Sequence, residues 1–353
     1  MHELLPNVVD LFCGVGGLTK GLADAGLNVV AGIDFDGDCE FAYSHNNRTK
    51  FYRHDVATLD SSFVHDLFPE RGLKVLSGCA PCQPFSRYGR GALQRRSKWS
   101  LLAEFGRIVV DVRPEIVTME NVPELEQHDV FTEFRRQLKD SGYAIVYGVM
   151  YCPDFGIPQS RHRLVLIGSL LGIPELPSAT HKPQQHPTVR IAIGKLAPIA
   201  AGQKDPTDEL HRSCQLNDIN QKRIRASKPG GTWRDWPKSL RAACHTRESG
   251  STYPSVYGRM DWDKPAPTIT TQFFGYGNGR FGHPEQDRAI SLREGAILQS
   301  FPKSYRFFEP GSYVSSQKLG QLIGNAVPVR LGKAVGRAIL EHIENASYKH
   351  VEA

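Results

Sequence analysis

A cysteine and a carboxylic acid each stand at the end of an apolar run that is typical of a buried β-strand. Cys82 lies in GCAPCQPFS after the run KVLSG (74–78), and Glu120 ends the run EIVTME (115–120). Since ligands bind at the carboxyl ends of parallel strands, we expect both groups to face one pocket. A thiolate can add to carbon 6 of a pyrimidine while a carboxyl group, whose proton burial helps to retain, donates to the ring nitrogen. Carbon 5 then becomes nucleophilic enough to attack a sulfonium methyl group.

Taken alone, the segment around Cys82 also admits other interpretations. Cys79 and Cys82 form a C-x-x-C pair. A redox pair of the thioredoxin kind would suit a much smaller domain, and a structural cysteine pair fits this segment equally well. A zinc site needs two further ligands at matching spacing. The candidates lie in another region of the chain: His211, Cys214, Cys244 and His245. We therefore predict no metal site.

A glycine-rich turn near the N-terminus could hold a cofactor. In VVDLFCGVGGL a strand runs into Gly14, Gly16 and Gly17 and a helix follows, so the backbone can approach a ligand closely. The dinucleotide-binding pattern is excluded, because Thr19 stands where its third glycine would be. Asp34 ends the next strand, where a carboxylate can accept hydrogen bonds from ribose hydroxyls. A nucleoside site and a plain tight turn both fit these residues alone.

Two arginines alternate just before the last strand of this region. Arg161 and Arg163 in FGIPQSRHRLVLIG point to one face together with Gln159. Two guanidinium groups beside a planar base could hydrogen-bond its carbonyl or orient the carboxylate of Glu120. A pair of surface arginines before an edge strand is the alternative.

The elements that must position these groups alternate between strands and helices over residues 8–168. Candidate helices such as LTKGLADAG (18–26) and LLAEFGRIVVDV (101–112) carry apolar residues at helical spacing. This alternation predicts an α/β fold with a mostly parallel sheet and helices on both faces. The candidate strands are VVDLF (8–12), NVVAGID (28–34), KVLSG (74–78), EIVTME (115–120), AIVYGVMY (144–151) and RLVLIG (163–168).

A region of different composition interrupts this pattern, so we predict three segments. Residues 1–173 form the α/β lobe, residues 174–287 form a smaller irregular domain, and residues 288–353 return to the first lobe. The middle segment is rich in Pro, Gly, His and Arg, and its aromatic residues can form a core. Between Pro174 and Pro265 it holds 7 Lys and 8 Arg against 6 Asp and 3 Glu, which accounts for the net charge of +6 of the whole chain. This balance indicates a phosphate-bearing partner or a solvated basic loop region.

Length and composition narrow the class of protein. A chain of 353 residues exceeds the usual size of one hydrophobic core. It shows neither a signal-peptide pattern nor an apolar run of the roughly 20 residues that a membrane span needs. Seven scattered cysteines suit free thiols in a reducing cytoplasm. We therefore expect a cytoplasmic protein that has no contact with membranes.

Taken together and in this order, the segments resemble the motifs of the bacterial-type cytosine-5 DNA methyltransferase family. DLFCGVGG, GIDFD and HDV resemble its cofactor motifs, GCAPCQPFS its Pro-Cys motif, MENV its Glu-Asn-Val motif, and QSRHR its Gln-x-Arg-x-Arg motif. RAISLREGAILQSFP and IGNAVPV are similar to its last two motifs, so the resemblance spans nearly the whole chain. The departures are small: Ser300 stands where Gly is common, and Cys13 where Ala or Ser is frequent.

This resemblance implies a Rossmann-like S-adenosylmethionine-dependent methyltransferase fold whose target-recognition domain is residues 174–287. The implied reaction moves a methyl group to carbon 5 of a cytosine that is flipped out of a specific double-stranded DNA sequence. Residues 86–100 would form a mobile loop that closes on phosphates. In the recognition domain QKRIR (221–225) is the densest basic cluster, with Arg223 and Arg225 as candidate DNA contacts.

The resemblance also implies a role for each site residue. Cys82 would bond to carbon 6 of the cytosine, helped by Pro81, and Glu120 would be the acid at the ring nitrogen. The implied catalytic residues are Cys82, Pro81, Glu120, Asn121, Arg161 and Arg163. Asp34 would hold the ribose of the cofactor, and Leu101 would close over its adenine. The implied cofactor-binding residues are Phe12, Gly14, Gly16, Gly17, Asp34, Phe35, Asp55, Val56, Leu101, Asn325, Ala326 and Val327.

Two other functions compete with this interpretation. A transfer-RNA cytosine-5 methyltransferase of the same fold has a short recognition segment with a Cys-Phe-Thr signature, which this chain lacks. A catalytically inactive DNA-binding paralogue usually loses the Pro-Cys or Glu-Asn-Val motif, and both are intact here. We expect a monomer that acts on double-stranded DNA in the cytoplasm, associated with the nucleoid. A restriction endonuclease acting on the same site is a candidate partner.

Overall fold

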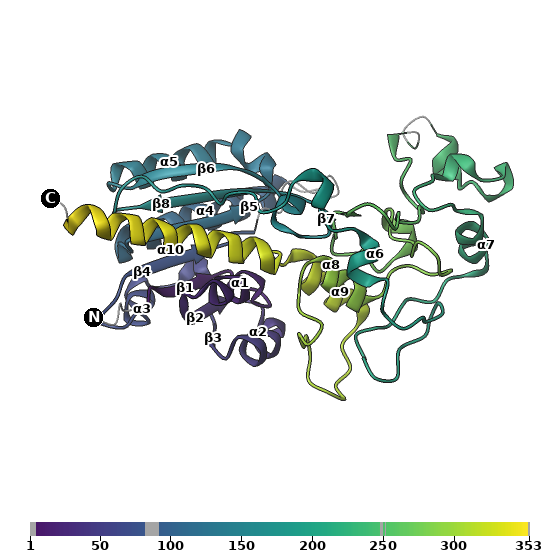
Figure 1. The fold of residues 1–353 in the computed structure, drawn as a ribbon, viewed down its shortest axis with the longest axis horizontal. Helices are drawn as coiled ribbons and strands as arrows, with labels where there is room; N and C mark the ends of the chain where they lie inside the picture. The colour runs from purple at the N-terminus through teal and green to yellow at the C-terminus, as the bar shows by residue number, and fades with distance from the viewer. Residues whose placement is uncertain (1–4, 82–91, 248–249, 251, 352–353) are drawn as a thin grey trace.

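The computed structural model describes residues 5–81, 92–247, 250 and 252–351, with only the backbone described for 92–100 and 348–351. In this part of the chain a lobe built on a seven-stranded sheet lies beside a second lobe with little regular structure (Figure 1). No helix within the described ranges is long and apolar enough to cross a membrane.

The central sheet has the strand order β3-β2-β1-β4-β5-β8-β6. Its strands are β1 (Asn7–Leu11), β2 (Asn28–Asp34), β3 (Lys50–Arg53), β4 (Lys74–Gly78), β5 (Ile116–Asn121), β6 (Ala144–Tyr151) and β8 (His162–Ser169). The pairs from β3 to β5 are parallel, whereas β8 runs antiparallel between β5 and β6. The strand order reverses between β1 and β4, and such a reversal opens a crevice at the carboxyl ends of the strands.

The predicted α/β fold with a mostly parallel sheet is confirmed. The strands predicted at 28–34, 74–78 and 144–151 have the predicted bounds, and the other three differ by one residue at each end. The edge strand β3 was not predicted, nor was the small sheet of β7 (Gln159–Ser160) and β9 (Ala266–Pro267).

Alternate residues of the central strands supply two hydrophobic cores, one on each face of the sheet. On one face Leu76 and Val117 pack with α3 (Ser61–Asp66), α4 (Ala92–Val112) and α5 (Asp129–Asp140). On the other face Val75 and Ile116 pack with α1 (Gly17–Ala25) and α10 (Val329–Val351). Helices therefore cover both faces, as period-2 alternation in a buried sheet requires.

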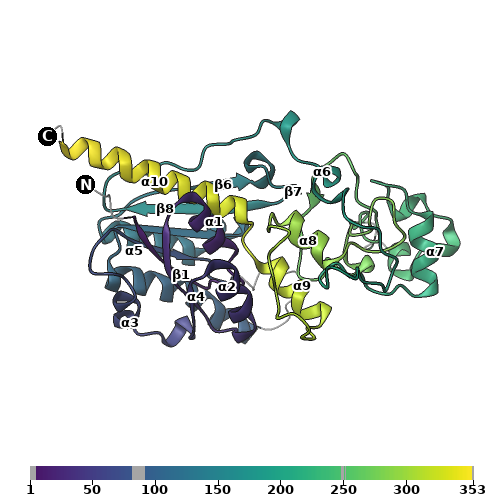
Figure 2. The same ribbon diagram turned by 60° about the horizontal axis from the view of Figure 1, so that its bottom comes forward.

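The first and last long helices of this lobe lie against each other (Figure 1 and Figure 2). Leu18 and Leu22 of α1 share a core with Leu331 and Val335 of α10. A Cβ atom on Gly21 would lie 2.3 Å from the carbonyl oxygen of Val329, so only glycine allows this approach. The C-terminal helix thus completes the lobe that the N-terminal strand begins.

The predicted helix at 101–112 is longer than expected. α4 begins at Ala92, so residues 92–100 of the predicted mobile loop are helical. The preceding residues 86–91 of that loop lie outside the described residues. The extension of the helix has a physical reason, because ALQRRSKW contains neither Gly nor Pro and consists mostly of good helix formers.

Four short α-helices lie between β8 and α10 in the described part of the chain. They are α6 (Val189–Ile193), α7 (Asp218–Ala226), α8 (Leu292–Leu298) and α9 (Ser316–Asn325), with α2 (Glu40–Asn47) of the first lobe alongside. One hydrophobic core joins residues of 189–290 with α8, α9 and Tyr43 of α2. The domain boundaries at 173/174 and 287/288 stay a prediction from composition.

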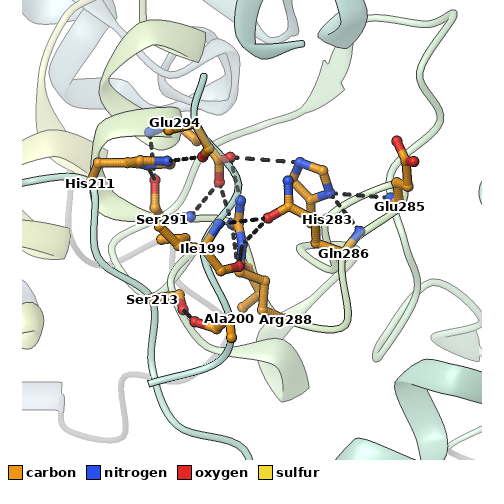
Figure 3. A network of polar contacts seen from close by, with 12 residues as sticks. Ile199, Ala200, His211, Ser213, His283, Glu285, Gln286, Arg288, Ser291 and Glu294 are labelled. Atoms are coloured by element: carbon orange, nitrogen blue, oxygen red, sulfur yellow. Dashed lines mark hydrogen bonds and ion pairs between the residues drawn. The ribbon is translucent and has the colours of Figure 1, made fainter. Parts of the chain in front are cut away.

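A buried ion pair fixes the start of α8. The Arg288 guanidinium donates to both carboxylate oxygens of Glu294, at 2.6 and 2.8 Å, and neither side chain is exposed by more than 1% (Figure 3). Ser291 caps the helix in a box with Glu294. His211 is hydrogen-bonded to the Ser291 hydroxyl at 2.8 Å, which joins residue 211 to the same network. This network is structural, because all of its polar groups are occupied by one another.

Candidate active site

The carboxyl end of β4 leads into the Pro-Cys segment, and a side chain of β5 holds it. The Asn121 amide donates to the Ala80 carbonyl oxygen at 3.0 Å, and its oxygen accepts from the backbone N–H of Val122 at 2.8 Å. Pro81 follows, half-buried, and Cys82 lies outside the described residues. Asn121 therefore fixes the backbone two residues before Cys82.

At the same edge of the sheet Glu120 is paired with an arginine of the neighbouring strand. Nε of Arg163 lies 2.8 Å from Oε1 of Glu120, and the two side chains are 12% and 10% exposed. Arg163 also donates to the carbonyl oxygen of His162 at 2.7 Å. The antiparallel pairing of β5 with β8 brings these residues together. The expected contact between an arginine and the carboxylate is present here.

Arg161 is turned toward backbone carbonyls. It is buried, and it donates to the carbonyl oxygens of Ile269, at 3.0 Å, and Gly324, at 3.5 Å. Burial, with a contribution from the charge of Arg163, lowers the pKa of Arg161 to about 9. Gln159 also bonds to the backbone of this segment, since its side-chain oxygen accepts from the N–H of Ile269 at 2.7 Å. Arg161 and Gln159 thus join β7 and β8 to distant segments of the chain.

Cys79, the other cysteine of the C-x-x-C pair, is half-buried after β4. Burial and the nearby charges of Glu120 and Asp10 raise the pKa of the Cys79 thiol well above its usual range. The thiolate is the nucleophilic form of cysteine, so a protonated Cys79 is a poor nucleophile at neutral pH. Among the described residues no group of three His, Cys, Asp or Glu side chains is arranged to hold a metal ion.

The glycine turn after β1 has the shape that its sequence predicts. Gly14 and Gly16 have φ angles of 51° and 83°, and Phe12 before them has 57°. A Cβ atom on Gly16 would lie 2.3 Å from Nδ2 of Asn47, whereas one on Gly14 would meet nothing within 4 Å. Gly16 is therefore required for packing, while Gly14 faces open space that a ligand could enter.

Asp34 at the end of β2 holds this turn. Its carboxylate accepts from the N–H of Gly14 and from the N–H of Asp36, both at 2.9 Å. Burial raises the pKa of Asp34 from its usual value. Next to it the ring of Phe35 is 66% exposed. The ring is therefore open to contact with a ligand next to the Asp34 carboxylate.

The remaining predicted cofactor residues come from three other segments. The backbone N–H of His54 donates to the Asp34 carbonyl oxygen at 3.1 Å, which places Asp55 and Val56 beside β2. The exposed Asp55 carboxylate accepts from the Ala57 N–H at 3.0 Å, and Val56 is buried.

The last predicted cofactor residues are Leu101 and the C-terminal segment 325–327. Leu101 and Phe12 pack half-buried on the same core. A Cβ atom on Gly17 would lie 2.3 Å from the Val327 carbonyl oxygen, so the segment after α9 packs directly on the glycine turn. In that segment Asn325 is exposed, Ala326 is half-buried and Val327 is buried.

Beneath the turn lies a buried carboxyl group that was not predicted. Asp10 accepts from the hydroxyls of Thr19, at 2.6 Å, and Ser77, at 2.8 Å, and is 1% exposed. Burial raises the pKa of Asp10 to about 6. The Tyr305 hydroxyl donates to the carbonyl oxygen of Val15 from the far end of the chain. The sequence does offer a signal for Asp10, because it is a charged residue inside the apolar run VVDLF. Such a residue is rarely buried without a partner, so its position indicates a buried polar contact.

In the second lobe an aromatic hub stabilises the basic segment. We give this name to Trp233, Trp236, His245, Tyr257 and Tyr276, whose rings pack in sequence. Trp233 and His245 are stacked with their centroids 4.5 Å apart, and the other pairs meet edge to face. Such pairs contribute about 0.5–1.5 kcal/mol each beyond burial, so the hub can hold a segment that has few regular elements.

Arg223 belongs to this hub and is not a freely exposed cation. Its guanidinium lies 5.2 Å from the Tyr257 ring centroid, and Nε donates to the Leu240 carbonyl oxygen at 2.9 Å. Arg225 lies 3.4 Å from a carboxylate oxygen of Asp287. The exposed cations of the described segment include Lys222, Lys228, Lys238 and Arg247. These four are better candidates for phosphate contact than the two arginines of QKRIR.

The fold is shared with solved structures. A DNA modification methyltransferase encoded within an E. coli prophage superposes with a TM-score of 0.74 at 22% identity, covering 97% of this chain and 100% of that one. The S. pombe Dnmt2 methyltransferase gives a TM-score of 0.63 at 19% identity. The chain therefore has the Rossmann-like methyltransferase fold.

The sequence comparisons define the family. The family model of the C-5 cytosine-specific DNA methylases matches residues 6–341. The Type II methylase M.HgiDII of Herpetosiphon aurantiacus is 50% identical over 340 residues, which is 96% of each chain. The Type II methyltransferase M1.HphI of Haemophilus parahaemolyticus is 31% identical over 350 residues, which is 94% of this chain and 86% of that one. This chain belongs to the C-5 cytosine-specific DNA methylase family.

Proposed function

We propose that this enzyme transfers a methyl group from S-adenosylmethionine to carbon 5 of a cytosine in a specific double-stranded DNA sequence. One observation carries the proposal. Pro81, which directly precedes Cys82 in the sequence, follows β4 and is half-buried, and Glu120 near the end of the adjacent strand β5 lies against Arg163. The match to M.HgiDII, a Type II methylase, supports a role in a restriction–modification system.

The chain's own residues supply a nucleophile and a proton donor. As the bond between the Cys82 sulfur and carbon 6 forms, ring electrons move toward carbon 5, and Glu120 donates a proton to the ring nitrogen. Carbon 5 then takes the methyl group, and the sulfur that carried it keeps the electron pair of the broken bond and leaves as an uncharged thioether. Loss of the carbon 5 proton to solvent, cleavage of the sulfur–carbon bond and return of the proton to Glu120 restore the aromatic ring and the thiolate.

The residues around the glycine turn fit an adenosyl ligand. Gly14 faces open space, Asp34 offers a buried carboxylate at a strand end, and Phe35 offers an exposed ring. When bound, S-adenosylmethionine supplies a methyl group on a positively charged sulfur. We assign Asp34 to the ribose, Phe35, Asp55 and Val56 to the adenine, and the remaining predicted cofactor residues to the walls of the pocket.

The second lobe is proposed to bind the DNA. A cytosine within a duplex cannot reach a strand-end site, so the base must leave the stack at a cost of a few kcal/mol. The exposed cations near the aromatic hub suit the phosphate contacts that hold the duplex during this step. Action on chromosomal DNA implies a location with the nucleoid, and a restriction endonuclease of the same specificity remains the proposed partner.

The proposal is tested by trapping the adduct between protein and DNA. Bisulfite sequencing of DNA from cells that express the protein first identifies the methylated site. Oligonucleotides with 5-fluorocytosine at that site should then form a covalent band on denaturing gels, because fluorine cannot leave as a cation. Wild type and Cys79→Ser should give this band only with S-adenosylmethionine, and Cys82→Ser should give none. Trapping by Cys82→Ser, or its loss in Cys79→Ser alone, would identify a different nucleophile.

A further inference from the structure

A lysine of α9 contacts the acidic loop that follows β2. Nζ of Lys318 lies 2.6 Å from a carboxylate oxygen of Asp38 and 3.5 Å from one of Asp36, and its side chain is 31% exposed. The two sides of this contact are 282 residues apart in the sequence. The hydrogen bond to Asp38 raises the pKa of Lys318, so the ammonium group is charged at neutral pH.

The loop that Lys318 contacts determines how the Asp34 carboxylate points. The backbone N–H of Asp36 donates to Oδ1 of Asp34 at 2.9 Å. The Asp36 carboxylate in turn accepts from the N–H of Asp38 at 3.1 Å and caps the 3₁₀ helix η1 (Gly37–Cys39). A shift of Asp36 would therefore rotate the carboxylate that is assigned to the ribose.

The same helix also reaches the other side of the proposed cofactor pocket. α9 ends at Asn325, and the Val327 carbonyl oxygen that follows packs on Gly17. Lys318 lies in the first turn of α9, where the helix dipole disfavours a positive charge. The two carboxylate partners therefore account for a lysine at this position, whereas the electrostatics of the helix N-terminus do not.

We propose that Lys318 is a positioning residue for S-adenosylmethionine, which acts by holding Asp36 so that Asp34 presents its carboxylate to the ribose. The inference rests on the proposed function, because it requires the adenosyl ligand at Asp34. Lys318 is not expected to touch the ligand itself. Its removal should raise KM for the cofactor and leave kcat unchanged.

A simple electrostatic effect of Lys318 predicts a different result. Removing the Lys318 cation, which lies against Asp36 and Asp38, would make the site more attractive to the positively charged sulfonium of S-adenosylmethionine. It would have less effect on S-adenosylhomocysteine, which lacks the sulfonium charge. Loss of positioning should instead weaken the binding of both ligands by the same factor, because both contain the same ribose.

The test is calorimetric titration of both ligands into Lys318→Met and Lys318→Arg. Lys20→Met is the matched control, since Lys20 is 26% exposed and pairs with Asp24 within α1. Lys318→Met should bind both ligands about fivefold more weakly, at the upper limit for an exposed ion pair. Lys318→Arg should restore most of the affinity, and Lys20→Met should bind as wild type does.

Asp38→Asn provides an independent check within the same ion pair. It should weaken the binding of both ligands as Lys318→Met does. The double variant should bind them no more weakly than either single variant. Unchanged affinity in Lys318→Met, tighter binding of S-adenosylmethionine alone, or additive losses would each overturn the inference. Failure of the wild type to bind either ligand would instead overturn the proposed function.

Discussion

Nε of Arg163 lies 2.8 Å from Oε1 of Glu120, across two antiparallel strands and almost out of contact with solvent. This contact holds the carboxyl group at a strand end before any substrate arrives. A preformed position of this kind spares the enzyme the reorganisation that a mobile acid would need.

The Glu120→Gln variant should keep this arrangement and lose the proton donor. Glutamine has nearly the same size and keeps an oxygen beside Arg163, but it cannot protonate a ring nitrogen. We expect the single-turnover rate of DNA methylation to fall by about 10²–10⁴, with unchanged affinity for S-adenosylmethionine by calorimetry. Glu124→Gln, an exposed neighbour, is the control. A rate for Glu120→Gln close to that of Glu124→Gln would remove Glu120 from the mechanism.

The Asn121→Ala variant should separate positioning of the Pro-Cys segment from cofactor binding. It removes the hydrogen bond to the Ala80 carbonyl oxygen, so the segment that leads to Cys82 loses its anchor on β5. We expect the rate of trapping by 5-fluorocytosine DNA to fall about tenfold or more. Asn28→Ala loses a hydrogen bond of 2.7 Å to the Asn7 side chain at the opposite end of the sheet, and this variant should be trapped at the normal rate. Normal trapping by Asn121→Ala would show that the segment is held by other contacts.

Asp10 should make the stability of the protein depend on pH in the acidic range. Because its pKa is raised to about 6, the folded protein keeps a proton that the unfolded chain releases. Its stabilising effect is complete below about pH 4 and is lost as the pH rises through 6. Relative to Asp10→Asn, the wild type should lose up to about 3 kcal/mol between pH 4 and 7.

Urea unfolding of both proteins at intervals of one pH unit measures this difference. Asp66→Asn, at an exposed position, is the control and should follow the wild type at every pH. A constant difference between the wild type and Asp10→Asn would mean that Asp10 is ionised in the folded protein. A growing advantage of the wild type at higher pH would reverse the sign and contradict the prediction.

Lys222 and Arg223 are adjacent in the sequence but should respond differently to charge reversal. Lys222→Glu should weaken DNA binding at every sequence and make the salt dependence less steep, with a slope of about −4 in place of the value of about −5 expected for about 6 phosphate contacts. Arg223→Glu should lower the melting temperature, because it removes a guanidinium packed on the hub and leaves the Leu240 carbonyl oxygen without its donor. Salt titrations and thermal unfolding of both variants are the measurements. A stable Arg223→Glu with reduced DNA affinity would place this arginine on the DNA.

The elements that the sequence predicts are those whose burial follows from a local pattern. β2, β4 and β6 are apolar runs between turn residues, and their bounds were predicted to the residue. β3 was missed because KFYR is short, lies at the sheet edge and has one buried residue. Its burial depends on β2 and not on its own composition.

The predicted side-chain contacts were less accurate where the two residues are distant in the sequence. The expected contact of an arginine with Glu120 was correct for Arg163, because both residues lie on adjacent strands. Arg161 instead bonds to carbonyl groups of Ile269 and Gly324, 108 and 163 residues away. No local periodicity carries such information. The packing of Arg223 on aromatic rings could not be predicted for the same reason, because its ring partners lie later in the chain, and its contact with DNA stays a prediction.

The packing of α10 on α1 has a consequence for how the chain is made. The apolar face of α1 leaves the ribosome early, whereas Leu331 and Val335, which cover it, are translated about 300 residues later. At about 5–20 residues per second this interval lasts roughly 15–60 s. During that time the nascent lobe exposes an uncovered hydrophobic stripe that chaperones can bind. A chain that ends at a stop codon before Val327 would lack both α10 and the segment that packs on the glycine turn, so we expect no active fragment from it.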